Sequence, residues 1–233
     1  MAKRASKRFK EISKQFNLAK TYTLAEAIAL LKQCLPVKFD QSIDVALKLG
    51  VDPKKSDQQV RSTVMLPHGT GKIARVVVLA KGDKVKEAIE AGADEAGDQE
   101  LVEKIKKGWT DFDVLIATPD MMREVGKLGR ILGPRGLMPT PKAGTVTPHV
   151  GRAVEESKKG KVEFKVDKNG VINNPIGKLS FGEEAVLENI HVFLSAVSRA
   201  KPATAKGQYF QRLFLSSTMG PGFRIDVNSI AMG

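Results

Sequence analysis

Residues 67–80, PHGTGKIARVVVLA, separate two kinds of sequence pattern in this chain of 233 residues. Before them, apolar and polar residues alternate, which is typical of half-buried strands. Pro67, Gly69 and Gly71 interrupt that alternation, because proline and glycine favour turns over regular elements. The run that follows, residues 73–80, is almost continuously apolar, as in parallel strands covered on both faces. We therefore expect a domain boundary within this stretch.

The segment before the boundary predicts one helix and two strands. Thr23 and Glu26 form a capping-box pattern, which indicates a helix up to about residue 35, with Cys34 as a small core residue near its end. Pro36 ends that helix. Residues 42–50 and 60–66 alternate regularly, and we expect them to pair as antiparallel strands.

The segment after the boundary alternates strands with helices. We expect helices at residues 83–91, 98–107 and 150–159, a helix start at 118–120 and a buried strand at 113–117. This order is typical of a Rossmann-like domain. From residue 161 the alternating pattern returns, with a strand at 162–166, an Asn169-Gly170 hairpin turn and strands at 209–215 and 223–227. Ser180 and Glu183 form a second capping-box pattern, opening a long helix that Pro202 ends.

The first and last thirds of the chain thus share one pattern, and the middle third has another. We predict a two-domain α/β protein in which residues 1–68 and 160–233 form a discontinuous α+β domain I. Residues 69–159 form domain II, an inserted Rossmann-like α/β/α domain.

Residues 126–151, GKLGRILGPRGLMPTPKAGTVTPHVG, have the most unusual composition in the chain, with six glycines, four prolines and no acidic residue. Such a run cannot be one regular element, so we expect an ordered loop. Its basic side chains, Lys127, Arg130, Arg135 and Lys142, and its backbone N–H groups are suited to an anion such as phosphate. A structural loop whose arginines only keep it soluble is an equal alternative.

The charge of the chain points to a polyanionic partner. The net charge is +12 and the isoelectric point is about 9.7, which favours nucleic acid, with a membrane surface as the rival. No apolar run is long enough to span a bilayer, and residues 1–16 lack the apolar core of a signal peptide, so we expect a cytoplasmic protein with no membrane partner.

The basic excess is unevenly distributed. Residues 70–159 carry 16 Lys and Arg against 14 Asp and Glu, which leaves 22 against 12 for the rest of the chain. The first twenty residues form a basic arm with one acidic residue, Glu11, against Lys3, Arg4, Lys7, Arg8, Lys10, Lys14 and Lys20. We therefore expect the main nucleic-acid surface on domain I.

Patterns for metal binding and catalysis are missing from the sequence. Cys34 has no second cysteine to pair with, and three dispersed histidines give no zinc cluster, so we expect no metal and no cofactor. Gly69, Gly71 and Lys72 lack phosphate-loop spacing, and Lys81-Gly82-Asp83 lacks the other glycines of a dinucleotide turn. We expect no catalytic residues and no enzyme. The alternative is a nucleotide-dependent enzyme that uses the Rossmann-like domain.

Two segments of domain I are suited to RNA. Lys38 and Phe39 place a cation beside an aromatic face, which can stack on a base while neutralising phosphate, although Phe39 as a core residue is an open alternative. Residues 216–222, SSTMGPG, form a hydroxyl-rich turn in which Met219 is flexible enough to lie against a ribose or base.

The motifs GRILGPRGLMPTPKAGTV at residues 129–146 and SSTMGPG at 216–222 resemble the signatures of the large-subunit ribosomal protein L-one family, bacterial type. The segments KFDQSIDVALKLGVDP, VRSTVMLPHGTGK, DFDVLIATPD and FLSSTMGP occur in the family's order, so the similarity covers essentially the whole chain. It implies domain I built from both chain ends, an inserted Rossmann-like domain II and hinges at Pro67, Gly69, Gly71 and Gly160.

The resemblance also implies functional residues and partners. The rRNA surface would comprise Lys38, Phe39, Lys165, Thr218, Met219, Gly220 and Pro221, with supporting phosphate contacts from Lys3, Arg4, Lys7 and Arg8. The implied partners are the stalk region of large-subunit rRNA, deacylated tRNA at the exit site and the mRNA leader of the protein's own operon, which it would repress. Arg130, Arg135 and Lys142 are candidates for a tRNA or second RNA surface, and we expect a monomer when free.

Overall fold

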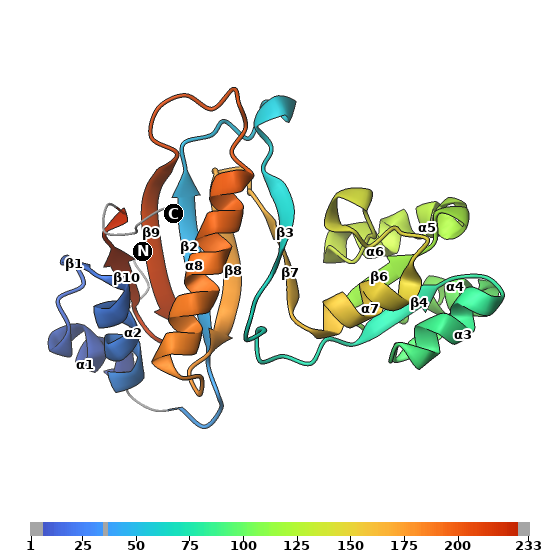
Figure 1. Ribbon diagram of the computed structural model, residues 1–233. Helices are drawn as coiled ribbons and strands as arrows, with labels where there is room; N and C mark the ends of the chain where they lie inside the picture. Colours follow the sequence, from blue (N-terminus) through green and yellow to red (C-terminus); the bar gives the residue numbers. More distant parts are fainter. Residues whose placement is uncertain (1–6, 35–36, 228–233) are drawn as a thin grey trace. The chain divides into compact units, whose positions relative to one another are not determined.

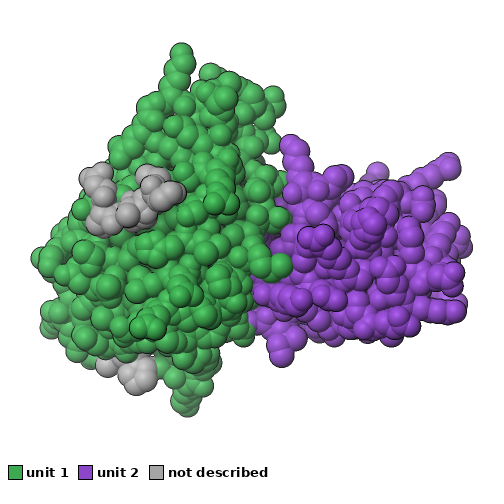
Figure 2. Space-filling view, in the orientation of Figure 1, with its two compact units in different colours: residues 1–71, 164–233 green, residues 72–163 purple. Residues whose placement is uncertain are grey.

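The computed structural model describes residues 7–34 and 37–227 (Figure 1). The chain divides into two compact units, coloured in Figure 2: unit 1, Met1–Gly71 with Phe164–Gly233, and unit 2, Lys72–Glu163. The sequence-based boundaries at 68/69 and 159/160 lie a few residues before those of the units. The α/β class expected from the sequence is confirmed by the mixture of helices and sheets.

Unit 1 contains a five-stranded sheet of order β1-β10-β9-β2-β8. Its strands are β1 (Thr21–Tyr22), β10 (Gly222–Ile225), β9 (Phe210–Ser217), β2 (Ser42–Leu49) and β8 (Val171–Lys178). The pairs are antiparallel except β1 with β10, which is parallel. Strands at both ends of the chain therefore meet in one sheet, and the expected pairing of residues 209–215 with 223–227 is confirmed by β9 and β10.

Two predicted strand pairings are wrong: that of residues 42–50 with 60–66, and the hairpin expected at Asn169-Gly170, because the strands on either side of this turn belong to different sheets. β2 pairs with β8 and β9, whereas β3 (Arg61–Met65) pairs with β7 (Lys161–Lys165) in a separate two-stranded sheet. Alternation shows that both segments are strands, but it contains no information about partners. A connection with a 3-10 turn at Ser56–Gln58 leads β3 away from β2.

The α-helices in the described part of unit 1 are α1 (Lys7–Gln15), α2 (Leu24–Gln33) and α8 (Glu183–Arg199). Thr23 and Glu26 form the predicted capping box, and Cys34 is buried. The second predicted capping box is wrong, because Gly182 is the N-cap of α8 and Ser180 instead donates its hydroxyl hydrogen to Asp40 Oδ2 at 2.8 Å. A hydrogen bond between two loops thus engages the serine that the local pattern had assigned to the N-cap of the helix.

Unit 2 has a parallel sheet of order β5-β4-β6, formed by β5 (Glu95–Gly97), β4 (Val76–Leu79) and β6 (Val114–Ala117). Val77 and Leu79 pack in a core with α4 (Gln99–Lys106) and α5 (Met122–Lys127), while Val76 and Val78 pack with α3 (Asp83–Glu90) and α7 (Val150–Lys158). Both faces of β4 are therefore buried, as its continuous apolar run predicts. The short β5 was missed because EAG has no strand-like pattern.

The glycine-rich run at 126–151 is only partly a loop. It contains α6 (Gly129–Arg135), with Pro134 inside, and a 3-10 turn at Pro141–Ala143, so the expectation of a loop throughout is wrong. Leu128 and Leu132 are fully buried in the core of unit 2, and this burial outweighs the poor helix propensity of glycine and proline. Gly136, at φ 72°, ends the helix in the left-handed conformation.

Candidate nucleic-acid interface

The turn that follows β9 is fastened to the start of β2. The Thr218 N–H donates to the Ser42 carbonyl at 3.1 Å, and the Ser42 N–H donates to Thr218 Oγ1 at 3.0 Å. One residue further along, the Met219 N–H donates to Gln41 Oε1 at 2.9 Å. The turn is therefore held in one position against a segment that is far away in the sequence.

Gly220 is required by the tight geometry of this turn. Its N–H donates to the Ser217 carbonyl at 3.0 Å, and a Cβ at this position would lie 2.2 Å from Ser217 Oγ. The buried Ser217 Oγ has no hydrogen-bond partner in the part of the chain that the structure describes. A residue larger than glycine would displace this hydroxyl.

Two large apolar side chains are exposed at the same end of the sheet. Phe39 is 53% exposed and Met219 is 54% exposed. The alternative that Phe39 is a core residue is therefore wrong. The hydrogen bond between Gln41 and Met219 joins the loop that carries Phe39 to the turn that carries Met219. The exposed Lys38 directly precedes Phe39.

The loop that carries Lys38 and Phe39 is itself fixed. Asp40 accepts hydrogen bonds from the N–H and the hydroxyl of Ser180, at 3.2 and 2.8 Å. Beside it, Gln41 is buried, and its carbonyl accepts the Leu179 N–H at 2.9 Å. Asp40 and Gln41 were missed by the sequence analysis, because nothing local distinguishes them from ordinary polar loop residues.

The Thr218 hydroxyl is already engaged within the protein. Besides accepting from Ser42, it lies 3.4 Å from the Ser42 carbonyl, to which its hydrogen can point. One lone pair is left for a ligand. Pro221 is buried, so its ring packs inside unit 1.

The structure does not bring Lys165 to this end. Lys165 ends β7, and the turn after it leads into Val171 of β8, which pairs with Lys48. Ser42, beside Thr218, is at the opposite end of β2, about 20 Å away for a strand of this length. Lys165 is exposed, but it belongs to another part of unit 1.

Of the basic N-terminal arm, Lys3 and Arg4 and the side chain of Arg8 lie outside the described residues. Lys7 is the first residue of α1 and is exposed. α1 itself packs through Ile12, which is fully buried.

In unit 2, Arg130, Arg135 and Lys142 are all exposed. Arg130 and Arg135 are five residues apart on α6, so they point about 140° apart around the helix axis. Residues 145–147 join the sheet through the Ala117 N–H bond to the Thr145 carbonyl at 2.9 Å and the Thr147 N–H bond to the Ala117 carbonyl at 3.2 Å. The segment around Lys142 thus has a structural role, whatever its side chains bind.

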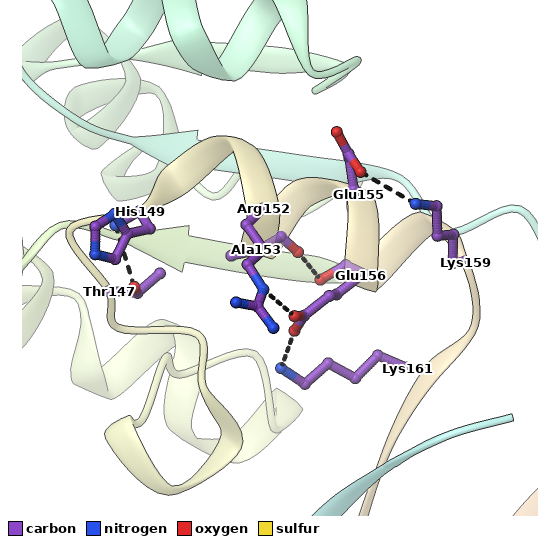
Figure 3. Close-up of polar contacts among 9 residues, drawn as sticks. Thr147, His149, Arg152, Ala153, Glu155, Glu156, Lys159 and Lys161 are labelled. Atoms are coloured by element: carbon purple, nitrogen blue, oxygen red, sulfur yellow. Dashed lines mark hydrogen bonds and ion pairs between the residues drawn. The ribbon is translucent and has the colours of Figure 1, made fainter.

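Figure 3 shows how the charges of α7 are paired. Glu156 accepts from Lys161 Nζ at 3.0 Å and from Arg152 Nε at 2.9 Å, and these hydrogen bonds lower the pKa of its carboxyl. Glu155 similarly pairs with Lys159 at 3.1 Å. Cations on this helix are therefore largely neutralised inside unit 2.

The expected hinge at Pro67 and Gly69 is tied to α8. Asn189 is fully buried, and its Oδ1 accepts the His68 N–H at 3.1 Å while its Nδ2 donates to the Gly69 carbonyl at 3.0 Å. Gly71 and Gly160 have φ of 71° and 98°, in the region that favours glycine. The sequence analysis missed Asn189, which sits in the apolar stripe of α8.

The described residues bring no group of His, Cys, Asp and Glu together that could hold a metal ion. No helix in the same residues combines the length and apolar character needed to cross a membrane.

Comparison with known proteins matches this chain over nearly its full length. A family model described as Ribosomal protein L1p/L10e family matches residues 30–221. The chain is 64% identical to the large ribosomal subunit protein uL1 of Protochlamydia amoebophila (strain UWE25) over 96% of this chain and 95% of the relative. It is 59% identical to the uL1 protein of Chlamydia trachomatis serovar L2b (strain UCH-1/proctitis) and 58% identical to that of Chlamydia abortus (strain DSM 27085 / S26/3), each over 96% of this chain and 97% of the relative. The chain therefore belongs to the ribosomal protein L1p/L10e family.

Proposed function

We propose that this protein binds large-subunit rRNA through the end of unit 1 formed by Lys38, Phe39 and the turn from Thr218 to Gly220. As a member of a family of ribosomal proteins, it is a structural constituent of the large ribosomal subunit in the bacterial cytoplasm and not an enzyme. The alternative of a nucleotide-dependent enzyme in unit 2 is therefore abandoned.

The observation that carries the proposal is the pair of exposed apolar side chains on two fixed loops. Phe39 and Met219 expose more than half of their surface, although apolar side chains of this size are usually buried. The hydrogen bonds from Met219 to Gln41 and from Ser42 to Thr218 hold both loops before RNA arrives. Binding then costs little ordering of the protein.

The expected chemistry divides among these side chains. Stacking of a base or ribose on Phe39 contributes about 1–3 kcal/mol, and Met219 supplies a polarisable surface beside it. Lys38 neutralises a phosphate, and the free lone pair of Thr218 accepts a 2′-OH. Lys165 lies toward the other end of β2 and Pro221 is buried, so neither shares this surface, and contact of Lys165 with another part of the rRNA stays a prediction.

We extend the proposal to three further roles that the family resemblance implies. The same surface would bind the leader of the protein's own mRNA and so repress translation. Arg130, Arg135 and Lys142 would contact deacylated tRNA at the exit site. Unit 1 would act as the rRNA-binding domain I and unit 2 as domain II. Hinge motion would occur at Gly71 and Gly160, because Gly69 is hydrogen-bonded to Asn189 and is therefore held in place.

The test is binding to a stalk fragment of large-subunit rRNA over a salt series. Met219→Ala and Phe39→Ala should each weaken binding about tenfold at constant salt, because they remove a stacking surface and no charge. Wild-type affinity in both variants would refute the proposed surface.

Thr218 requires a more careful choice of variant. Thr218→Val removes the acceptor of the Ser42 N–H, so a loss of binding would mix recognition with distortion of the turn. Thr218→Ser keeps the hydroxyl and should bind like wild type. If Thr218→Val binds normally while its turn stays intact by NMR, the hydroxyl has no part in recognition.

A further inference from the structure

The five-stranded sheet of unit 1 buries one face and leaves the other partly open. Val45, Leu47, Leu213 and Leu215 are buried, on the face that α2 and α8 cover. The residues between them in β2 and β9 are half-buried or exposed, as are Asn173 and Arg224 on the strands at either side. Among the described residues, this open face carries the charged side chains of the sheet.

Strand register arranges this face into two neighbouring rows. In the first, Phe214 is paired with Arg224 on β10 and with Ala46 on β2. In the second, Arg212 is paired with Lys48, which in turn pairs with Val171. Phe214 thus has one arginine directly across from it and another two residues along its own strand.

Hollows in the surface converge on Arg212. A shallow hollow of about 430 Å³ is lined by the apolar Ala46, Val171 and Phe214, with Lys48, Gln211 and Arg212 around them. Two adjoining hollows of about 920 and 380 Å³ share Gln211 and Arg212 with the first. They add the cations Lys55, Lys206 and Arg224 against the carboxylates Asp52 and Asp226.

Two charges on this face, those of Lys48 and Arg212, are arranged unfavourably for folding alone, while the carboxylate Asp44 lies farther along the face, opposite Ser216. Lys48 and Arg212 lie directly opposite each other, and like charges at such positions destabilise a sheet. Lys48 donates to the Asn169 carbonyl, which does not neutralise it. No carboxylate of the described residues forms an ion pair with Arg212 or Arg224. A bound anion would relieve this repulsion.

We propose that this open face is a second RNA contact, which holds a single-stranded segment with a base against Phe214 and phosphates on Arg212 and Arg224. An apolar hollow of this size with cations at its rim has the chemistry of single-strand binding surfaces, where bases stack and phosphates are neutralised. The inference rests on the proposed function, since it extends the RNA surface from Thr218 along the same strand, β9. It is separate from Phe39 and Met219, which lie at the other end of β2.

Fluorescence anisotropy with a labelled short oligouridylate tests this proposal on the full chain. Phe214→Leu keeps the apolar volume but removes the ring, and it should weaken binding about tenfold. Phe214→Tyr restores the aromatic face and should bind within about twofold of wild type, which separates stacking from a folding defect. Arg212→Gln combined with Arg224→Gln should reduce the dependence of log K on log salt by about 1.4, for two phosphate contacts.

The matched control removes two cations elsewhere on unit 1. Arg199→Gln with Lys201→Gln changes the net charge equally, at the end of α8, on the covered side of the sheet. It should leave the affinity for oligouridylate nearly unchanged. An equal loss in this control would mean that net charge alone acts, and the proposal would be wrong.

The two RNA surfaces are distinguished by a second probe. Met219→Ala should weaken binding to the stalk rRNA fragment and leave oligouridylate binding intact. If wild type fails to bind the stalk fragment, the proposed function fails. If it binds the fragment but Phe214→Leu binds oligouridylate like wild type, only the second contact fails. Displacement of oligouridylate by an oligoglutamate peptide at equal concentration would overturn the assignment to RNA in favour of an acidic protein.

Discussion

The two units use their positive charge in different ways. Unit 2 pairs many of its cations with its own carboxylates, as in Arg75 with Asp111 at 2.7 Å and Lys104 with Glu95 at 2.7 Å. The described part of unit 1 has fewer such pairs, for example Lys32 with Glu183 at 3.6 Å. Cations that are already neutralised have little to offer to phosphate. This difference supports our proposal that unit 1 provides the main RNA surface, while much of the charge of unit 2 stabilises unit 2 itself.

The largest expected effect comes from removing Asn189 of α8, whose side chain is hydrogen-bonded to His68 and Gly69. Asn189→Ala leaves the His68 N–H and the Gly69 and Ile176 carbonyls without their partner, and it should lower the free energy of unfolding of unit 1 by about 3 kcal/mol. Amide hydrogen exchange, read separately for each unit, measures this. The neighbouring Glu188→Ala removes only the exposed contact to His68 and should cost less than about 1 kcal/mol. Equal losses would show that Asn189 has no special role.

Glycines in the two units should respond in opposite directions. Gly220→Ala in unit 1 forces a Cβ against Ser217 Oγ, so we expect a loss of about 1–2 kcal/mol in stability. Gly126→Ala in α5 of unit 2 meets no atom within 4 Å beyond its chain neighbours and its own helix backbone, and it should stabilise by about 0.5–1 kcal/mol. Thermal unfolding of both variants checks the signs. A neutral Gly220→Ala would mean that the turn can relax.

Two variants that each remove one positive charge, one in each unit, test whether RNA binding depends more on unit 1 than on unit 2. Lys38→Gln in unit 1 should weaken binding to the stalk fragment about threefold to tenfold and lower the salt slope by about 0.9. Lys104→Gln in unit 2 removes a cation that is paired with Glu95 and lies 4.0 Å from the Trp109 ring centroid, so the affinity should stay the same. If the two variants lose equal affinity, unit 2 contributes as much as unit 1.

The smallest effect is a difference in acid response. The pKa of Glu156 in unit 2 is lowered by hydrogen bonds from Lys161 and Arg152, so its stabilisation is present above its ordinary pKa of 4.5 and is lost as the pH falls through the lowered value. In unit 1, burial raises the pKa of Asp44, with Lys178 opposing in part. Protonation of Asp44 on acidification therefore favours the folded state. Hydrogen exchange between pH 6 and about pH 3 should show unit 2 losing protection before unit 1. The reverse order would contradict these assignments.

The local sequence pattern predicted an element correctly where that element's own residues are enough to specify a helix or a strand. The apolar run of β4, the capping box at Thr23 and the stripe of α8 all follow from the order of residues along a few turns or one strand. The change of pattern at residues 67–80 also coincides with the division into units. The family resemblance likewise came from residues 129–146 and 216–222, and it is confirmed by the matching family.

Pattern failed where residues far apart compete for one partner. Ser180 was expected to cap α8, but Asp40 binds it across the fold. Residues 60–66 were expected beside β2, but β8 and β9 occupy both of its edges. The family resemblance, and not a local pattern, grouped Lys165 with Thr218, and the strand order shows only that the two lie at different ends of β2.

The sequence by itself thus determined most of the helices and strands, the α/β class, the family and the excess of positive charge, because these depend on composition and short-range order. Only the tertiary structure decided that Phe39 is exposed, that the Thr218 hydroxyl is bound to Ser42 and that Phe214 lies between two arginines on an open face. These facts depend on strand pairing and on bonds between loops over more than a hundred residues of sequence. Such long-range contacts are selected by the packing of the whole unit and leave no local pattern in the chain.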